Sequence, residues 1–300
     1  MRKSTKMEAI ETEFPGNHFM DNLDQLDAAV PGGVYLCQIS ENISCGACCG
    51  LYNVSDASPG RVTAILEWRT RAFAEVPRRM DDIWDFMKMV EARENQDRPF
   101  PHFHHCPYLG LVGKRRSRVG CLLHPYGDGN HGVDLRGLSY YGGMACRTYF
   151  CPTYRHLSPE RKQVIRAVAE DWYGYGLIIT EWKLLSAFFD EIESRMGRQV
   201  TPHLVESGAF RTALQAVLRL KREWPFRIDP DRPASYFFED GNHPKSPLDW
   251  DVIGVEGSPY AIILEELEAG LDSPAALRRA ETRLERVFMP FGAAGLGYPP

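Results

Sequence analysis

The sequence predicts a mainly α-helical protein whose helices wrap an irregular, cysteine-rich centre. Three observations lead to this prediction. Apolar residues recur every three or four positions over most of the chain, which is typical of helices with one buried face. Ser-Pro pairs stand before several of these stretches, as they do at helix starts. Between residues 98 and 154 the helical period is lost, and glycine, proline, histidine and cysteine accumulate.

Two helices are predicted in the first third of the chain. Ser58 and Pro59 fit an N-cap followed by proline in the first turn, and apolar residues at helical spacing follow them. Pro77 interrupts this pattern, because proline lacks the amide that a continuing helix needs. Residues 83–90 again have apolar side chains at helical spacing, which predicts the second helix.

Five more helices are predicted in the C-terminal half. Ser158 and Pro159 begin the first of them, and Gly174 and Gly176 are expected to break the chain after it. Residues 226–258 are rich in Pro, Asp and Gly and are expected to form an extended surface excursion. The apolar patterns place the other four helices at residues 182–196, 210–218, 262–267 and 277–287.

These patterns divide the chain into three parts. Residues 1–33 lack apolar periodicity, which predicts a flexible N-terminal arm. Residues 34–157 form the cysteine-cluster region, which is expected to open with a short strand at residues 34–37. Residues 158–300 form a helical region that packs on it.

Composition limits the classes of function. The 300 residues have a net charge of −5 and a pI near 6.0, so the chain lacks the basic character of a nucleic-acid-binding protein. One basic run, at residues 114–118, could touch phosphates, offset negative charge at a metal site or lie exposed in a loop. The chain shows no secretory signal and no run of about 20 apolar residues. These features predict a cytoplasmic protein that does not associate with a membrane. A protein partner is possible, but the sequence does not identify one.

Eight cysteines are the main chemical feature of the chain. Cys45, Cys48 and Cys49 lie within five positions, and Cys37 precedes them. In a reducing cytoplasm, thiols at such spacings indicate metal ligation rather than disulfides. The two-residue gap between Cys45 and Cys48 is common to zinc and iron–sulfur sites, and Gly46 permits the tight turn that this gap requires.

A second group of cysteines follows later in the chain. It consists of Cys106, Cys121, Cys146 and Cys151, and His124 follows Cys121 at the spacing of a metal ligand. The two groups together exceed the four ligands of one zinc ion. This excess favours an iron–sulfur cluster over zinc and leaves open whether there is one metal site or two.

These cysteines stand in four motifs: Cys45-Gly46-Ala47-Cys48-Cys49, Cys106-Pro107-Tyr108-Leu109, Gly120-Cys121-Leu122-Leu123-His124 and Cys146-Arg147-Thr148-Tyr149-Phe150-Cys151. In order and spacing, residues 35–155 resemble the bacterial YkgJ-like cysteine-cluster proteins, described as a zinc- or iron-chelating domain with a C-x-x-C-x-x-C-C opening. The resemblance implies that the metal ligands are Cys45, Cys48, Cys49, Cys106, Cys121, Cys146 and Cys151. Asn42 stands where the opening motif has its first cysteine, so Cys37 is a candidate substitute, and His124 is a further candidate.

Three functions stay open. The first is a metal-binding protein in which an iron–sulfur cluster, or zinc, has a structural, redox or sensing role. The second is a cluster-containing enzyme, such as a transferase similar to flagellin lysine N-methylase, whose cysteine region resembles this one. No glycine-rich loop for a methyl donor follows a predicted strand, and the spacing assigns no catalytic residue. The third is an interaction module that zinc stabilises.

Overall fold

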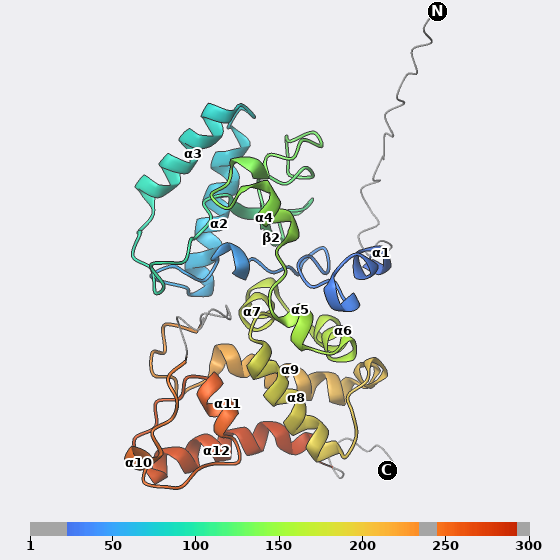
Figure 1. The fold of residues 1–300 in the computed structure, drawn as a ribbon, viewed down its shortest axis with the longest axis vertical. Helices are drawn as coiled ribbons and strands as arrows, with labels where there is room; N and C mark the ends of the chain where they lie inside the picture. Colours follow the sequence, from blue (N-terminus) through green and yellow to red (C-terminus); the bar gives the residue numbers. More distant parts are fainter. Residues whose placement is uncertain (1–22, 234–244, 293–300) are drawn as a thin grey trace, which may run out of the picture.

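The computed structural model describes residues 23–233 and 245–292, and these residues are mainly α-helical, as predicted. Figure 1 shows two lobes, which follow one another along the chain. The N-terminal lobe contains α2 (Pro59–Ala74), α3 (Met80–Arg93), β1 (Leu109–Val112), β2 (Arg118–Cys121), η4 (Arg136–Leu138) and α4 (Gly142–Thr148). The C-terminal lobe contains α5 (Thr153–His156), α6 (Pro159–Val168), α8 (Trp182–Met196), η5 (Pro202–Glu206), α9 (Gly208–Glu223), α10 (Trp250–Ile253), α11 (Ala261–Glu266), α12 (Pro274–Phe288) and η6 (Met289–Phe291).

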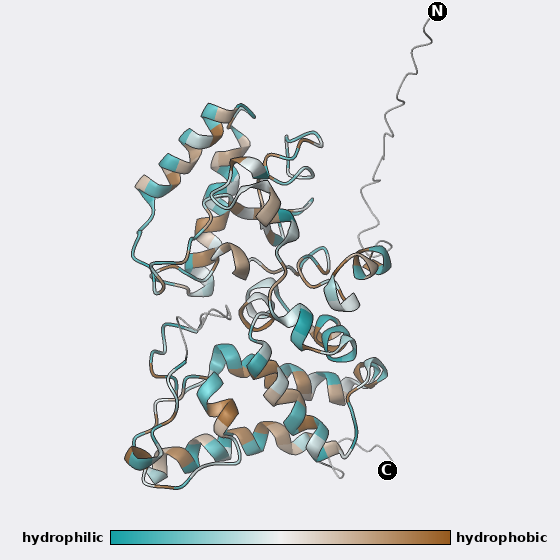
Figure 2. Ribbon diagram, in the orientation of Figure 1, coloured by the Kyte–Doolittle hydropathy of each residue, from teal (hydrophilic) through white to brown (hydrophobic). Residues whose placement is uncertain are grey.

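Each lobe has its own hydrophobic core. In the N-terminal lobe, Leu66 of α2, Ile83 of α3 and Tyr108 before β1 are fully buried in the smaller core. The larger core lies among α6, α8, α9, α11 and α12. Helices such as α12 have hydrophilic as well as hydrophobic residues, and the buried ones recur at three- and four-residue spacing (Figure 2). Within the two described ranges, no helix is long and apolar enough to cross a membrane.

Helix α7 (Trp172–Ile178) connects the two cores. Its Tyr173 and Leu177 belong to the smaller core, while Tyr175 and Ile178 belong to the larger one. Since side chains three and four residues apart lie on one helix face, α7 presents one face to each lobe.

The predicted break at Gly174 and Gly176 is wrong, because α7 runs through both glycines. Asp171 begins this helix by accepting a hydrogen bond from Gly174 N at 2.6 Å. A Cβ at Gly176 would collide with the hydroxyl of Tyr52. Gly176 therefore permits a close approach between the lobes rather than a break in the helix.

The predicted N-terminal arm is partly described. Residues 1–22 lie outside the described part, while Leu23–Ala28 form helix α1 and Pro31–Gly33 form the turn η2. The carboxylate of Asp27 forms an ion pair with Arg166 of α6 at 2.7 Å. This contact attaches the described part of the arm to the C-terminal lobe.

Helices begin at the predicted Ser-Pro pairs. The hydroxyl of Ser158 accepts a hydrogen bond from Arg161 N, and that of Ser273 accepts one from Ala276 N. At Ser58 the helix also begins at the following proline, without a bond to the side chain. The helices predicted in the C-terminal half are present as α6, α8, α9, α11 and α12. Residues 234–244 of the predicted surface excursion lie outside the described part.

The strand predicted at residues 34–37 is wrong. The backbone of Leu36 bonds to side chains instead of a second strand. Its amide donates to the hydroxyl of Tyr154 at 2.7 Å, and its carbonyl accepts a hydrogen bond from the hydroxyl of Tyr175 at 2.8 Å. These two tyrosines satisfy the groups that a strand would offer to a partner.

The stretch predicted to be irregular contains the antiparallel hairpin of β1 and β2, in which Leu109 pairs with Cys121. The basic run at residues 114–118 forms its turn. Arg118 at the end of this run lies 3.3 Å from the carboxylate of Glu41. This ion pair therefore connects the hairpin to the loop between Cys37 and Cys45, in which Glu41 lies.

The C-terminal lobe contains a buried ion-pair network. The carboxylate of Glu181, just before α8, lies 3.0 Å from the ammonium of Lys221 in α9 and 2.7 Å from that of Lys245. Lys245 also pairs with Glu266 of α11 at 2.6 Å. Burial acts to raise the pKa of Glu181, but the two ammonium groups outweigh it and lower that pKa to about 2.

Replacing Glu181 by Gln is expected to lower the free energy of unfolding by about 3 kcal/mol, because two buried ammonium groups lose a shared counter-charge. Chemical denaturation measures this change. In the wild-type protein this contribution is present above the ordinary Glu pKa and is lost as pH falls towards about 2. The control is Glu67→Gln, which removes only an exposed pair with Arg71 and should cost less than about 1 kcal/mol. Equal losses in the two variants would contradict the role of Glu181.

Candidate metal centre

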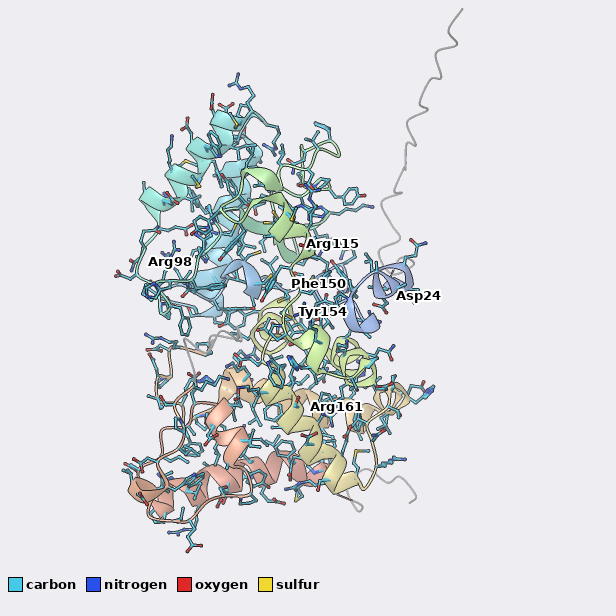
Figure 3. The ribbon with its side chains drawn as sticks, viewed as in Figure 1. Asp24, Arg98, Arg115, Phe150, Tyr154 and Arg161 are labelled. Atoms are coloured by element: carbon cyan, nitrogen blue, oxygen red, sulfur yellow. The ribbon has the colours of Figure 1, made fainter. Side chains whose placement is uncertain are left out.

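All eight cysteines are free thiols, and six of them belong to or pack against a hydrophobic core. Cys106 and Cys151 are buried, and the other six are half-buried. Cys45 packs against both hydrophobic cores. Figure 3 shows Phe150 and Tyr154, on either side of Cys151 in sequence, at the junction of the lobes.

The first cysteine loop is held by its own backbone. Cys45 N donates a hydrogen bond to Cys37 O at 2.7 Å. Cys48 and Cys49 lie on the single turn η3 (Ala47–Cys49). The amide that begins this turn points at the sulfur of Cys45 at 3.5 Å, and an amide in that position stabilises a thiolate.

Gly50 brings the first cysteine group to the second. It ends η3 with a φ of 78°, in the left-handed region that favours glycine. A Cβ at Gly50 would collide with the carbonyl oxygen of His104 and would lie 2.8 Å from the Cα of His105. Through this close approach, Cys106 N donates a hydrogen bond to Cys49 O at 2.9 Å.

Four of the thiols interact electrostatically around Cys48. Burial, followed by charge on Cys48, raises the pKa of Cys37 and of Cys151 to about 12. The same two causes raise the pKa of Cys45 well above its usual value. A hydrogen bond with Cys49 lowers the pKa of Cys48, which is therefore the favoured thiolate. The pKa of each of the other three thiols therefore depends on the charge of Cys48.

The remaining thiols interact with one another and, at Cys49 and Cys106, also with Cys48. Burial raises the pKa of Cys106 to about 11, and charge on Cys146 adds to this rise. Burial, then Cys106 and Cys146, raise the pKa of Cys121 to about 12. The hydrogen bond with Cys48 comes first among the causes that raise the pKa of Cys49. Burial and charge on Cys48 follow, and then charge on Cys106 and Cys121. Each thiolate thus makes its neighbours harder to deprotonate, and a bound cation removes this penalty.

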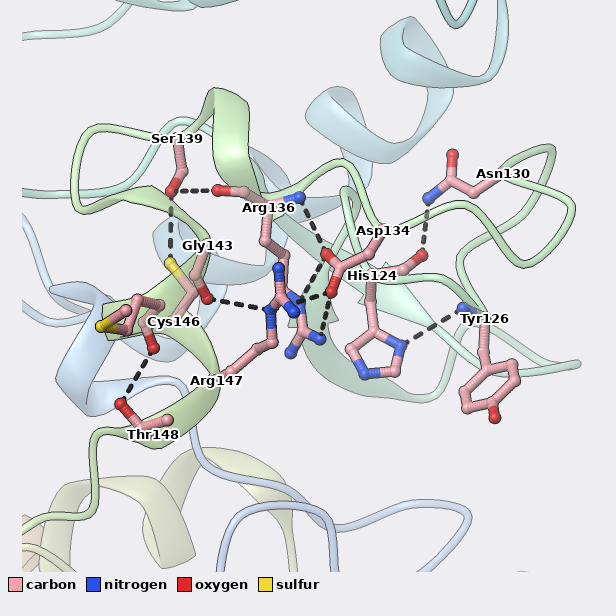
Figure 4. A network of polar contacts seen from close by, with 11 residues as sticks. His124, Tyr126, Asn130, Asp134, Arg136, Ser139, Gly143, Cys146, Arg147 and Thr148 are labelled. Atoms are coloured by element: carbon pink, nitrogen blue, oxygen red, sulfur yellow. Dashed lines mark hydrogen bonds and ion pairs between the residues drawn. The ribbon is translucent and has the colours of Figure 1, made fainter.

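A polar network positions Cys146 (Figure 4). The hydroxyl of Ser139 lies 3.2 Å from the sulfur of Cys146 and donates to the carbonyl of Arg136 at 2.8 Å. The guanidinium of Arg136 pairs with Asp134 at 2.7 Å. Arg136 also interacts electrostatically with Cys121 and Cys146, so the second group of thiols has a cation beside it.

A buried arginine supports the second group from α2. Arg69 donates to the carbonyl of Cys106 at 2.9 Å and pairs with Glu94. It also donates to Nε2 of His105 at 2.7 Å, while Nδ1 of His105 donates to Gly50 O at 2.6 Å. Both imidazole nitrogens are therefore used. Burial and the charge of Arg69 lower the pKa of His105, so this neutral imidazole positions the cysteine turn and has no nitrogen left for a metal.

The sequence analysis missed Arg69, because a charged residue within a helical pattern is usually exposed. A signal was present. Arg69 follows Leu66 by three residues and precedes Phe73 by four, so the helical period places it on the buried face of α2. A buried arginine requires partners, and here the partners are groups of the cysteine region.

The structure also distinguishes two candidate histidines. Nδ1 of His124 accepts a hydrogen bond from Tyr126 N at 3.3 Å, and burial followed by Arg136 lowers the pKa of His124 to about 4. Nδ1 of His124 is therefore occupied by a hydrogen bond from the backbone. Nε2 of His104 is buried without a hydrogen-bond partner in the described part of the chain, and the ring stacks on Tyr140 at 4.2 Å. His104 is thus the better nitrogen donor.

Within residues 23–233 and 245–292, no three Cys, His, Asp or Glu side chains form a group with the geometry of a metal site. The seven predicted cysteine ligands and Cys37 are therefore not arranged around a common point.

Comparisons of the chain with protein-family models, with curated proteins and with solved structures found no match. The resemblance to the YkgJ-like proteins stays a prediction, and the function is argued from the site itself.

Replacing Gly50 by Ala is expected to separate the two cysteine groups and to lower the free energy of unfolding by about 3 kcal/mol. The strain of a left-handed residue contributes about 1–2 kcal/mol of this, and overpacking adds the rest. Chemical denaturation measures the loss, and thiol-reagent kinetics should show faster modification of Cys49 and Cys106.

The control for this variant is Gly60→Ala. Gly60 lies in the first turn of α2, and a Cβ there would meet open space. This change is expected to leave stability unchanged or to raise it by up to about 1 kcal/mol. Similar effects of the two substitutions would contradict the close approach at Gly50.

Proposed function

We propose that the protein binds metal through its clustered cysteines, as an iron–sulfur cluster or as zinc, in a structural, redox or sensing role. One observation carries this proposal. The chain holds eight free thiols at short spacings, and six of them belong to or pack against its two hydrophobic cores (Cys37, Cys45, Cys49, Cys106, Cys121 and Cys151).

The donor set fits such a group. Thiolate sulfur is the ligand common to structural zinc and to iron–sulfur clusters, and four thiolates complete either one. The thiols are free and partly buried, and those at Cys37, Cys121 and Cys151 have a pKa near 12. A bound metal supplies the positive charge that holds such sulfurs as thiolates. Free thiols also agree with a reducing compartment such as the cytoplasm.

The chain provides cations that offset the charge of such a centre. Four thiolates around a divalent ion leave about −2. Arg69 and Arg136 interact with the thiols of Cys106 and Cys121 respectively. Lys162 interacts with Cys151. The positive charges are held by ion pairs or backbone carbonyls, so their position does not depend on the metal.

The enzyme alternative requires a pocket for a methyl donor. A cleft between α6, α7 and α9 is lined by Tyr175, Asp171 and Arg219 among others, and its volume is about 40 Å³. Ligand pockets usually measure about 300 Å³ or more. This cleft holds a water molecule or two and gives no support to a transferase activity.

Anaerobic purification followed by visible absorption and by iron, sulfide and zinc analysis tests the proposal. A brown protein with equal molar amounts of iron and sulfide would identify an iron–sulfur cluster. A colourless protein with tightly bound zinc would exclude the cluster and support a zinc site. The control is a Cys45→Ser, Cys48→Ser variant, which should lose metal. A wild-type protein that contains neither metal, and takes up neither on reconstitution, would contradict the proposal.

Metal binding is also expected to release protons. The pKa of Cys106 lies at about 11 and those of Cys37 and Cys121 at about 12. These thiols are protonated at pH 7, so each should release close to one proton when it binds zinc, and affinity should fall as pH falls. Because the pKa of Cys48 is lowered, this thiol should release a smaller fraction of a proton when it binds zinc. Calorimetric titration with zinc in two buffers of different ionisation enthalpy counts the protons, and fewer than two per zinc would contradict ligation by thiols.

A further inference from the structure

We propose that the surface around helix α4 binds single-stranded nucleic acid, and that the ring of Tyr140 is a stacking platform for one base. Three features of this surface support such a site. They are a group of exposed aromatic side chains, the geometry of three rings and a local excess of positive charge. None of these features depends on a bound metal.

Large apolar side chains are exposed as a group around α4. Tyr140 and Tyr141 precede this helix, Met144 lies in it and Tyr149 follows it, and Tyr140 is 71% and Met144 80% exposed. None of the seven residues of α4 is buried. Single exposed apolar side chains are ordinary on a protein surface, but a group of them indicates a binding surface.

Two neighbouring rings fix the orientation of Tyr140. Its ring stacks on that of His104, with the centroids 4.2 Å apart and the planes 18° from parallel. The ring of Tyr141 is nearly perpendicular to both, with its centroid 5.5 Å from that of His104 and 5.2 Å from that of Tyr140. Because Tyr141 is almost equally distant from the two stacked rings, it lies beside the stack and not on top of it. The face of Tyr140 that points away from His104 is therefore left uncovered by these two rings.

A ring held in this way is a preformed platform for a base. Aromatic side chains of single-strand-binding proteins stack on successive bases, and every base offers a flat face for this contact. Because Tyr140 is already ordered by His104 and Tyr141, little freedom is lost when a base stacks on it. In a duplex the bases stack on one another, so the platform suits a single strand.

The chain around this platform has an excess of positive charge. Residues 98–150 contain seven Lys and Arg, two Asp and no Glu, whereas the whole chain has a net charge of −5. Both aspartates lie beside arginines, since Asp128 is 4.0 Å from Arg116 and Asp134 is 3.1 Å from Arg147 (Figure 4). Charges interact over about 10 Å at 0.1 M salt. A bound strand therefore responds to this local excess rather than to the net charge of the chain.

Arg147 connects the positive charge to the platform. Its Nε donates a hydrogen bond to the carbonyl of Gly143 at 3.1 Å, so the side chain turns back towards the end of α4 that follows Tyr140 and Tyr141. A guanidinium in this position suits the phosphate next to a stacked base. An acidic protein surface would be attracted by the same charges, but it would not require a tyrosine ring fixed with one face open.

Fluorescence anisotropy with a labelled oligothymidylate of about 20 nucleotides, added to the full-length protein as purified, tests this site. Affinity is expected to fall about 20-fold between about 50 and 200 mM salt if three phosphates are contacted. Tyr140→Ala should weaken binding at least about fivefold, because one stacked base is lost, while Tyr140→Phe keeps the ring and should bind like the wild type. Arg147→Gln should weaken binding and reduce its salt dependence.

The control is Ile262→Ala, which changes an exposed apolar side chain in α11 of the other lobe and should leave affinity unchanged. Absence of binding at about 50 mM salt, or equal affinities of Tyr140→Ala and the wild type, would overturn the proposal. Equally tight binding of a duplex of the same length would also overturn it, and this comparison needs no variant to fold. Sedimentation velocity adds one more outcome, since a wild-type dimer that Tyr140→Ala dissociates would assign the surface to a second copy of the chain instead.

Discussion

Free thiols, six of which belong to or pack against the two hydrophobic cores, are the constraint on which the rest of the structure depends. A thiolate is costly to bury, and each thiolate makes the next one harder to form. The pKa values near 12 at Cys37, Cys121 and Cys151 result from both effects. A cation removes both at once, so the contacts between the lobes are expected to be stronger when metal is bound.

The surroundings of the thiols are built to keep positive charge in place. Arg69 is held by Glu94, and Arg136 is held by Asp134. Lys162 donates to the backbone carbonyls of Gly32 and Tyr154. These cations have partners of their own, so they remain beside the sulfurs whether or not metal is bound. Each of them also lowers the cost of the net negative charge that several thiolates leave on a metal.

The helices were predictable because their signals are local. The Ser-Pro starts at Ser158 and Ser273 and the apolar period of α8 and α12 depend only on neighbouring residues. The errors came from tertiary contacts. Gly176 looked like a break, but it makes room for Tyr52 of the other lobe. The predicted strand at residues 34–37 failed because tyrosine hydroxyls take its hydrogen bonds.

The ligand assignment stays a prediction from the sequence, where short cysteine spacings and a tight turn at Gly46 are visible. The sequence did not predict how the thiols are arranged. Which core each thiol adjoins depends on contacts between segments about a hundred residues apart, such as Tyr154 beside Cys37. The role of Arg69 was hidden for the same reason, because its partners Glu94 and His105 are distant in sequence.

Anomalous diffraction at the iron and zinc edges, from crystals of the anaerobically purified protein, tests the central claim most directly. Metal binding by the clustered cysteines predicts anomalous peaks at the junction of the lobes, each surrounded by cysteine sulfurs that include Cys45, Cys106 or Cys151. A map with no such peaks, in which these sulfurs are joined in disulfides or remain free, would contradict it.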